Sequence, residues 1–150
     1  MFSVFRVNSL MTPSPEFLRA DEMLRVADDL MKMGRIRHLP VLAADSDELV
    51  GVVTQRDLFR SALAQKMGLD DASADEALDS IRVESVMTSD PIWVAPGTSI
   101  TEAAETMIEK KIGCLQVLEN GELRGILTES NFVEMMANSE MRSRLRRDAE

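Results

Sequence analysis

The sequence has one cysteine, one histidine and no long apolar run, and each scarcity excludes a class of protein. Cys114 has no second cysteine with which to form an internal disulfide, which fits a reducing compartment. No apolar run approaches the roughly 20 residues that span a bilayer, and the first ten residues lack the long apolar core of a signal peptide. We therefore expect a cytoplasmic protein that does not enter the membrane.

Basic residues are also scarce, with 17 lysines and arginines against 26 acidic residues and a formal net charge of −9. A field of this sign repels phosphodiester backbones and anionic lipids, so nucleic acid is not an expected partner. Cys114 and His38 are too few to complete a metal site, and the sequence has neither a catalytic triad nor a Walker-type glycine loop. We expect no catalytic residue, no metal and no required cofactor, and hence no enzyme.

The chain contains two imperfect copies of one unit, at residues 7–58 and 83–132. A register of 76 pairs Met11 with Met87, and it holds until a two-residue contraction. Beyond that point, a register of 74 pairs Gly51 with Gly125, Thr54 with Thr128 and Asp57 with Asn131. Copies of roughly 70 residues bury too little surface to be stable alone. We therefore expect the two copies to share one core and to form a single folding unit.

The ends of the copies divide the chain into repeat 1 at residues 1–65, an acidic linker at 66–82, repeat 2 at 83–138 and an arginine-rich C-terminal helix or tail at 139–150. The linker is rich in acidic and small residues, which predicts a helix end and a solvated segment with room for one more helical turn. The terminal arginines fit two interpretations. They belong either to a solvated, frayed helix or to an extra contact with phosphate or a partner.

Each copy is predicted to form a strand, a helix, two strands and a helix, which is the α+β class. Apolar residues recur at helical spacing from Ala20 to Met31 and from Ile100 to Ile108. Ser99 has the capping-box spacing to Glu102, and Asp21 is the expected cap of the first helix. The β-rich runs at 38–42 and 49–54, and at 114–118 and 123–128, predict two hairpins, with closing helices that begin near Arg56 and Ser130.

In each copy the last strand leads directly into a helix, and this junction has two interpretations. The structural one is that Thr54 caps the helix while Asp57 lies in its first turn, where the helix dipole favours a carboxylate. The functional one is that unsatisfied N–H groups at the helix start bind a phosphate, while Asp57 accepts hydrogen bonds from the two hydroxyls of a ribose. The sequence leaves both open.

This ordered set of motifs resembles the CBS domain in its usual tandem pair, the Bateman module. The first copy contributes Met11-Thr12 with Pro15, residues 35–41, and Gly51-Val52-Val53-Thr54 with Asp57. The second contributes Met87-Thr88 with Pro91, residues 112–117, and Gly125-Ile126-Leu127-Thr128 with Asn131. The resemblance covers residues 7–137. It implies two β-α-β-β-α repeats packed sheet to sheet about a pseudo-twofold axis, with two clefts.

The resemblance further implies a regulatory module that binds an adenosine-containing ligand such as AMP, ADP, ATP or S-adenosylmethionine. As an energy or metabolite sensor it would act on an unidentified target protein, and it would associate as a homodimer of CBS pairs. Apolar faces on the helices predicted at 57–67 and 131–137 also favour a dimer. The implied ligand-binding residues of the first cleft are Thr12, Arg37, His38, Leu39, Pro40, Thr54, Arg56 and Asp57.

The second copy departs from this pattern. Asn131 replaces the aspartate, Gln116 the proline and Cys114 the histidine, and an amide lacks the charge assistance that strengthens carboxylate hydrogen bonds. We therefore predict unequal clefts, the weaker one formed by Thr88, Lys111, Thr128 and Asn131. The alternative is a structural or protein-interaction module whose clefts hold no ligand.

Overall fold

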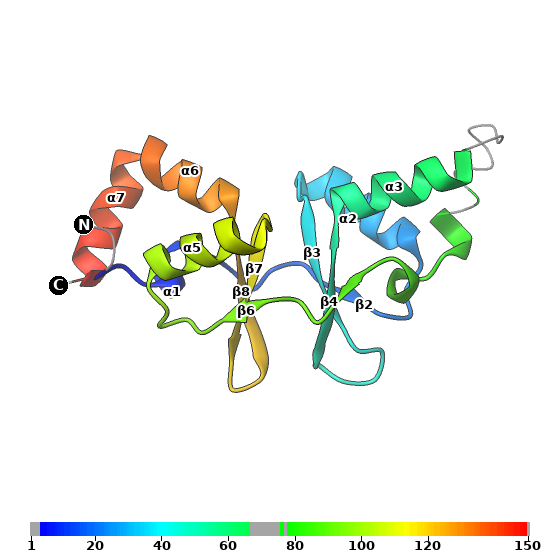
Figure 1. The fold of residues 1–150 in the computed structure, drawn as a ribbon, viewed down its shortest axis with the longest axis horizontal. Coiled ribbons are helices and arrows are strands. Elements are labelled where there is room, and N and C mark those ends of the chain that lie inside the picture. The colour runs from blue at the N-terminus through cyan, green and yellow to red at the C-terminus, as the bar shows by residue number, and fades with distance from the viewer. Residues whose placement is uncertain (1–3, 67–75, 77, 150) are drawn as a thin grey trace. The chain divides into compact units, whose positions relative to one another are not determined.

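The computed structural model describes residues 4–66, 76 and 78–149, and it confirms the α+β class (Figure 1). The chain forms two compact units, each with one four-stranded sheet and its own helices. Unit 1 consists of Met1–Pro15 and Ile92–Glu150, and unit 2 consists of Glu16–Pro91. In the part of the chain that the structure describes, no helix has the length and apolar character needed to cross a bilayer.

Unit 2 is built on a sheet with the strand order β2-β3-β4-β5. Its strands are β2 (Leu18–Arg19), β3 (His38–Leu42), β4 (Leu49–Thr54) and β5 (Thr88–Ser89). Its helices are α2 (Leu24–Gly34), α3 (Gln55–Lys66) and the short 3-10 helix η2 (Val83–Ser85). β2 runs parallel to β3 and the other pairs are antiparallel, so the predicted hairpin of the first copy is confirmed.

Unit 1 repeats this arrangement with the strand order β1-β8-β7-β6. Its strands are β1 (Thr12–Pro13), β6 (Trp93–Val94), β7 (Cys114–Glu119) and β8 (Glu122–Thr128). Its helices are α1 (Val7–Leu10), α5 (Ile100–Lys110), α6 (Glu129–Ala137) and α7 (Ser139–Ala149). The second predicted hairpin is confirmed, and α3 and α6 each begin one residue before the position expected from the sequence.

The first strand of each copy joins the sheet of the other copy. β1, from the first copy, pairs with β8, so that Thr12 lies opposite Ile126. β5, from the second copy, pairs with β4, so that Thr88 lies opposite Val52. The chain passes from one unit to the other at the equivalent positions 15–16 and 91–92, directly after a proline in each case. The units are therefore assembled from exchanged segments and do not coincide with the two sequence copies.

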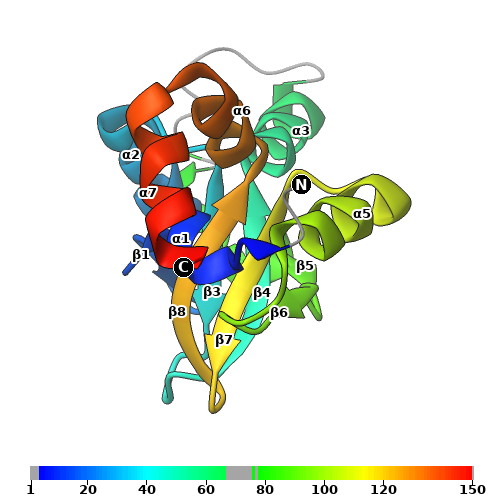
Figure 2. The same cartoon turned by 90° about the vertical axis from the view of Figure 1, so that its left-hand side faces the viewer.

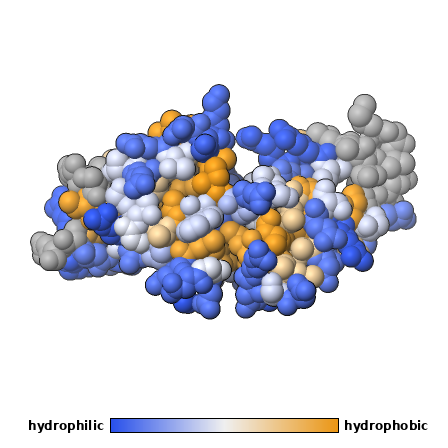
Figure 3. Space-filling model, turned by 60° about the horizontal axis from the view of Figure 1, so that its bottom comes forward, coloured by the Kyte–Doolittle hydropathy of each residue, from blue (hydrophilic) through white to orange (hydrophobic). Residues whose placement is uncertain are grey.

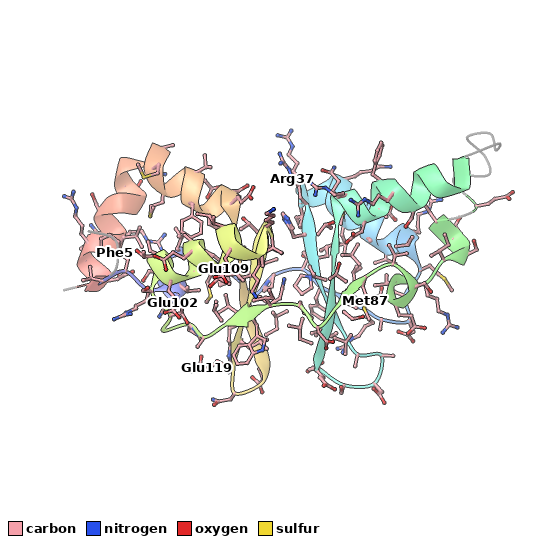
Figure 4. The ribbon with its side chains drawn as sticks, viewed as in Figure 1. Phe5, Arg37, Met87, Glu102, Glu109 and Glu119 are labelled. Atoms are coloured by element: carbon pink, nitrogen blue, oxygen red, sulfur yellow. The ribbon has the colours of Figure 1, made fainter. Side chains whose placement is uncertain are left out.

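Two glycines allow the exchanged segments to pack closely. A Cβ atom added at Gly125 would lie 2.5 Å from the sulfur of Met11 and 2.9 Å from the carbonyl oxygen of Thr12. One added at Gly51 would lie 2.5 Å from the sulfur of Met87 and 3.0 Å from the corresponding backbone oxygen of β5. Figure 4 labels Met87 close to β4. The glycines that the repeat register pairs are thus the points where each sheet accepts the other copy's strand.

Two clusters of buried hydrophobic residues are present, one in each unit, and the sharing of one core by the two copies stays a prediction. Alternate residues of the central strands belong to these clusters, and the residues between them are also mostly buried. The unit 1 cluster consists of Phe5, Val7, Leu10, Ile100, Ala103, Met107, Leu115, Val117, Leu127, Met135 and Leu145. The unit 2 cluster consists of Leu18, Ala20, Leu24, Ala27, Met31, Leu39, Val41, Val53, Leu58 and Val83.

The first residues of α5 and α2 show whether the two predicted N-caps, Ser99 and Asp21, are present. Ser99 caps α5, because its side chain accepts a hydrogen bond of 3.1 Å from the backbone N–H of Glu102, as predicted. Asp21 does not cap α2, and that prediction was wrong. The N-cap of α2 is Met23, which makes no side-chain cap bond; the backbone N–H of Leu24 instead donates to the carbonyl oxygen of Ile81. Backbone from elsewhere in the unit replaces the missing cap.

The C-terminal helix packs against its unit instead of fraying into solvent. Leu145 of α7 is fully buried in the unit 1 cluster, and α7 contacts α1 and α6 (Figure 2). Arg144, Arg146 and Arg147 remain exposed on the same helix. In the predicted linker, α3 ends at Lys66 and residues 78–80 are helical. Most of the intervening segment lies outside the described residues.

The glycine packing predicts a matched set of stability changes. Gly51→Ala and Gly125→Ala should each lower the free energy of unfolding by about 1–3 kcal/mol, because the methyl group meets backbone as well as a flexible methionine. Gly97→Ala is the control, since nothing lies within 4 Å of a Cβ there, and we expect a change within about 0.5 kcal/mol. Urea unfolding followed by circular dichroism measures all three. Equal effects at the three positions would contradict this packing.

Candidate ligand-binding site

The junction of β4 and α3 in unit 2 is closed by a reciprocal pair of hydrogen bonds. The backbone N–H of Thr54 donates to Oδ2 of Asp57 at 2.9 Å, and the backbone N–H of Asp57 donates to Oγ1 of Thr54 at 3.1 Å. This is capping-box geometry with aspartate at the third helical position. The structural interpretation of the motif is therefore confirmed, and any ligand must bind to side chains that already cap a helix.

Asp57 keeps capacity to accept further hydrogen bonds. Its side chain is partly exposed, and the cap uses only Oδ2. In the described part of the chain, no residue donates to Oδ1. An ionised carboxylate accepts about four hydrogen bonds, so Asp57 can cap the helix and also receive hydroxyl donors from outside.

Three further predicted residues lie at the same end of the unit 2 sheet. His38 is directly opposite Thr54 on neighbouring strands. The carbonyl oxygen of Arg37 accepts a hydrogen bond of 2.8 Å from the backbone N–H of Gln55, which fixes Arg37 beside the start of α3 (Figure 4). Arg56 is exposed in the first turn of that helix. Among the described residues, neither arginine has an acidic partner within ion-pair distance. The structure thus places two arginines of the chain beside the Asp57 junction.

Leu39 and Pro40 lie on opposite faces of β3. Leu39 is fully buried in the cluster beneath the helices, so its side chain is a core residue that does not reach the face carrying His38 and Thr54. Pro40 lies on that second face, opposite Val52. The alternation of strand residues explains this difference, which the sequence resemblance alone did not resolve.

Because of the strand exchange, Thr12 lies in the sheet of the second copy and Thr88 in the sheet of the first. Thr12, expected beside Thr54 and Asp57, lies in unit 1, where its Oγ1 accepts a hydrogen bond of 3.3 Å from Nδ2 of Asn131. Thr88, expected beside Asn131, lies in unit 2 opposite Val52. The segments 7–15 and 83–91 share five of nine residues, and no sequence signal indicated which sheet each would join.

The equivalent junction in unit 1 satisfies its own polar groups. Oδ1 of Asn131 accepts hydrogen bonds from the backbone N–H of Thr128 at 2.8 Å and from its hydroxyl at 3.2 Å, and Nδ2 donates to Thr12. Asn131 is only 6% exposed. Lys111 lies apart from this network as the left-handed C-cap of α5. The two junctions are therefore unequal in structure: in the described part of the chain, one carboxylate oxygen of Asp57 has no donor, whereas both the oxygen and the nitrogen of the Asn131 amide have a partner.

Two pKa shifts belong to ion pairs on α2. The hydrogen bond and charge of Asp28 raise the pKa of Lys32, whose Nζ lies 2.8 Å from the Asp28 carboxylate. The hydrogen bond from Arg25 lowers the pKa of Asp79. Neither pair includes a residue of the junctions. In the residues that the structure describes, no three histidine, cysteine or acidic side chains come together as metal ligands.

Comparisons with known proteins agree with this fold. The CBS domain family model matches residues 7–64 and 83–138. The structure of AcuB from Vibrio cholerae is similar with a TM-score of 0.75 and 33% identity, covering 92% of this chain and 95% of that one. The structure of CBSX2 in complex with AMP is similar with a TM-score of 0.73 and 27% identity, covering 89% and 97%.

Among curated proteins, inosine-5'-monophosphate dehydrogenase from Staphylococcus haemolyticus is 35% identical over 125 residues. That match covers 82% of this chain but only 22% of the enzyme. The chain thus spans about a fifth of the length of this relative, and the likeness concerns that part alone.

Because the amide of Asn131 donates a hydrogen bond to Thr12, we expect Thr12 and Thr88 to contribute differently to the stability of the ligand-free protein. Thr12→Val removes the acceptor of a buried N–H group and should lower the free energy of unfolding by about 1–2 kcal/mol. Thr88→Val is the matched control, because no hydrogen bond of the Thr88 side chain is present in the described part of unit 2. Chemical unfolding of the two variants measures the difference. Equal losses in the free energy of unfolding would contradict a stabilising hydrogen bond between Asn131 and Thr12.

Proposed function

The chain belongs to the CBS domain family, and on that basis we propose that it is a cytoplasmic, non-enzymatic regulatory module that binds an adenine nucleotide. CBS domains are generally regulatory and non-catalytic. The candidate ligands are AMP, ADP, ATP and S-adenosylmethionine, and no cofactor is required. The observation that carries the proposal is the Oδ1 atom of Asp57, which has no donor among the described residues and lies at a helix start that also carries Arg56; the structure of the similar protein CBSX2 contains AMP.

Each part of the junction has a role in this proposal. Oδ1 of Asp57 accepts hydrogen bonds from the ribose hydroxyls. Arg37 and Arg56 bind phosphate oxygens, because guanidinium groups form bidentate, charge-assisted hydrogen bonds with them. The start of α3 adds the favourable end of a helix dipole. Thr88 takes the place that the sequence assigned to Thr12. The unit 1 junction contributes less affinity, since its amide is already engaged.

The ligand acts as a signal only if it binds two arrangements of the protein with different affinity. The ligand then stabilises one arrangement, and a target protein responds to that change in population. The competing proposal is a structural or protein-interaction module that binds no nucleotide. The hydrogen bonds of Asn131 to Thr128 and Thr12 favour that interpretation for unit 1, whereas the partly exposed carboxylate of Asp57 does not favour it for unit 2.

We also propose that the module associates as a homodimer. Phe59 on α3 and Val133 on α6 are 64% and 66% exposed, and the register of 74 makes them equivalent positions of the two copies. Hydrophobic patches interrupt the hydrophilic surface of the face drawn in Figure 3. Large side chains exposed at the same place in both copies fit a self-complementary interface, in which one patch meets its counterpart on a second chain.

The Asp57 proposal is tested by calorimetric titration with AMP, ADP, ATP and S-adenosylmethionine. Asp57→Asn keeps an acceptor for the helix cap but removes the charge, so it should weaken nucleotide binding about tenfold while unfolding stability stays nearly constant. Asp57→Ala should weaken binding further and also remove the cap. Asn131→Ala should have a smaller effect on affinity than either.

Two results would count against the proposal. No heat of binding and no thermal shift with any of the four ligands would leave the competing interaction module as the better account. Equal losses of affinity in Asp57→Ala and Asn131→Ala would remove the claim that the first-copy junction dominates.

The dimer is tested by light scattering coupled to size-exclusion chromatography. Phe59→Ser with Val133→Ser should convert the dimer to a monomer, because the substitutions remove exposed apolar area without touching the buried clusters. Phe17→Ser is the control, since Phe17 is also exposed but lies outside α3 and α6. A monomeric wild-type chain, or loss of the dimer in the control, would contradict this interface.

A further inference from the structure

The two helices that close the repeats, α3 and α6, carry charges of opposite sign. They begin at Gln55 and Glu129, which are equivalent positions in the register of 74. α3 contains three basic residues and one acidic residue, whereas α6 contains two acidic residues and no basic one. Their net charges are +2 and −2. The repeat therefore duplicates the helix but reverses the sign of its charge.

This difference in charge lies beside the exposed apolar residues of the proposed dimer surface. Arg60 directly follows Phe59 on α3, and Glu134 directly follows Val133 on α6. Arg60 and Glu134 are both exposed, and the register of 74 makes them equivalent. In the part of the chain that the structure describes, neither of them forms an ion pair. Each helix thus presents an apolar side chain next to a charged one that is available to a second chain.

The two ways of pairing these surfaces between two chains differ in their electrostatics. If like helices meet, Arg60 faces Arg60 of the second chain and Glu134 faces Glu134, so that both contacts are repulsive. If α3 of one chain meets α6 of the other, each contact joins an arginine to a glutamate. A twofold axis then forms this contact twice, because the contact of α3 with α6 implies the reciprocal one. Like charges facing each other across an interface are costly, so the charges favour the second pairing.

We propose that α3 of one chain packs against α6 of a second copy in the homodimer, with Arg60 paired to Glu134. The inference rests on the proposed homodimer and adds the pairing of its helices. A second copy is the occupant because every chain carries both faces, the basic one on α3 and the acidic one on α6. Unit 2 of one chain therefore contacts unit 1 of the other.

Charge reversal in the full chain tests this pairing, with the dissociation constant of the dimer measured by analytical ultracentrifugation. Arg60→Glu and Glu134→Arg each place like charges at both symmetry-related contacts, so each should raise that constant at least about tenfold. Combining the two substitutions restores opposite charges and should return the constant to within about threefold of the wild-type value. At about 1 M salt, where the Debye length is about 3 Å, the effects of the single reversals should largely disappear.

Arg144→Glu on α7 and Glu105→Arg on α5 are the matched controls. Both residues are exposed, and the substitutions change the net charge as the tested ones do, so the dissociation constant should change by no more than about twofold. Recovery of the dimer in the double variant also shows that the single variants are folded.

Three results would overturn the pairing of α3 with α6 and leave the homodimer standing. They are single reversals that dimerise like the wild-type chain, a double variant as weak as the single ones, and controls as weak as the single reversals. A monomeric wild-type chain would overturn the homodimer and the pairing together. Nucleotide binding is measured in a separate titration and depends on neither result.

Discussion

The close approach of the backbone at Gly51 and Gly125 is the constraint on which the rest of the structure depends. At these two points the sheet of one unit accepts a strand from the other copy, with a methionine lying over the glycine. A side chain at either position would meet a carbonyl oxygen as well as that methionine. The two sheets, and hence the two hydrophobic clusters beneath them, reach four strands only because this contact is possible.

The β4–α3 and β8–α6 junctions are equivalent in the sequence repeat, but after the strand exchange their polar side chains make different hydrogen bonds. In unit 1 an asparagine links the imported threonine to the helix cap, so the imported strand is tied to the junction. In unit 2 an aspartate makes only the cap, and one of its oxygens has no partner in the described residues. A single change from amide to carboxylate thus separates a junction that stabilises its unit from one that is available to a ligand.

Much of the fold could be predicted from the sequence, since periodicity and turn residues act locally. The hairpins, the closing helices and the Ser99 cap follow from neighbouring residues. The sequence could not show which sheet Thr12 or Thr88 joins, because the choice depends on contacts with distant residues. Asp21 has the residue type of a cap, but the backbone carbonyl of Ile81 serves the start of α2. Burial of Leu39 likewise appears only in three dimensions.

The division of the chain also has a consequence for its synthesis. Unit 2 is one continuous stretch, Glu16–Pro91, so all of its strands have been made once Pro91 is joined. Unit 1 needs residues from both sides of that stretch, and β1 must wait for β8 before it has a neighbour. At ribosomal rates of about 5–20 residues per second, the N-terminal segment waits on the order of ten seconds. During that interval its apolar residues Phe5, Val7 and Leu10 have no native core to enter, and they are exposed to chaperones.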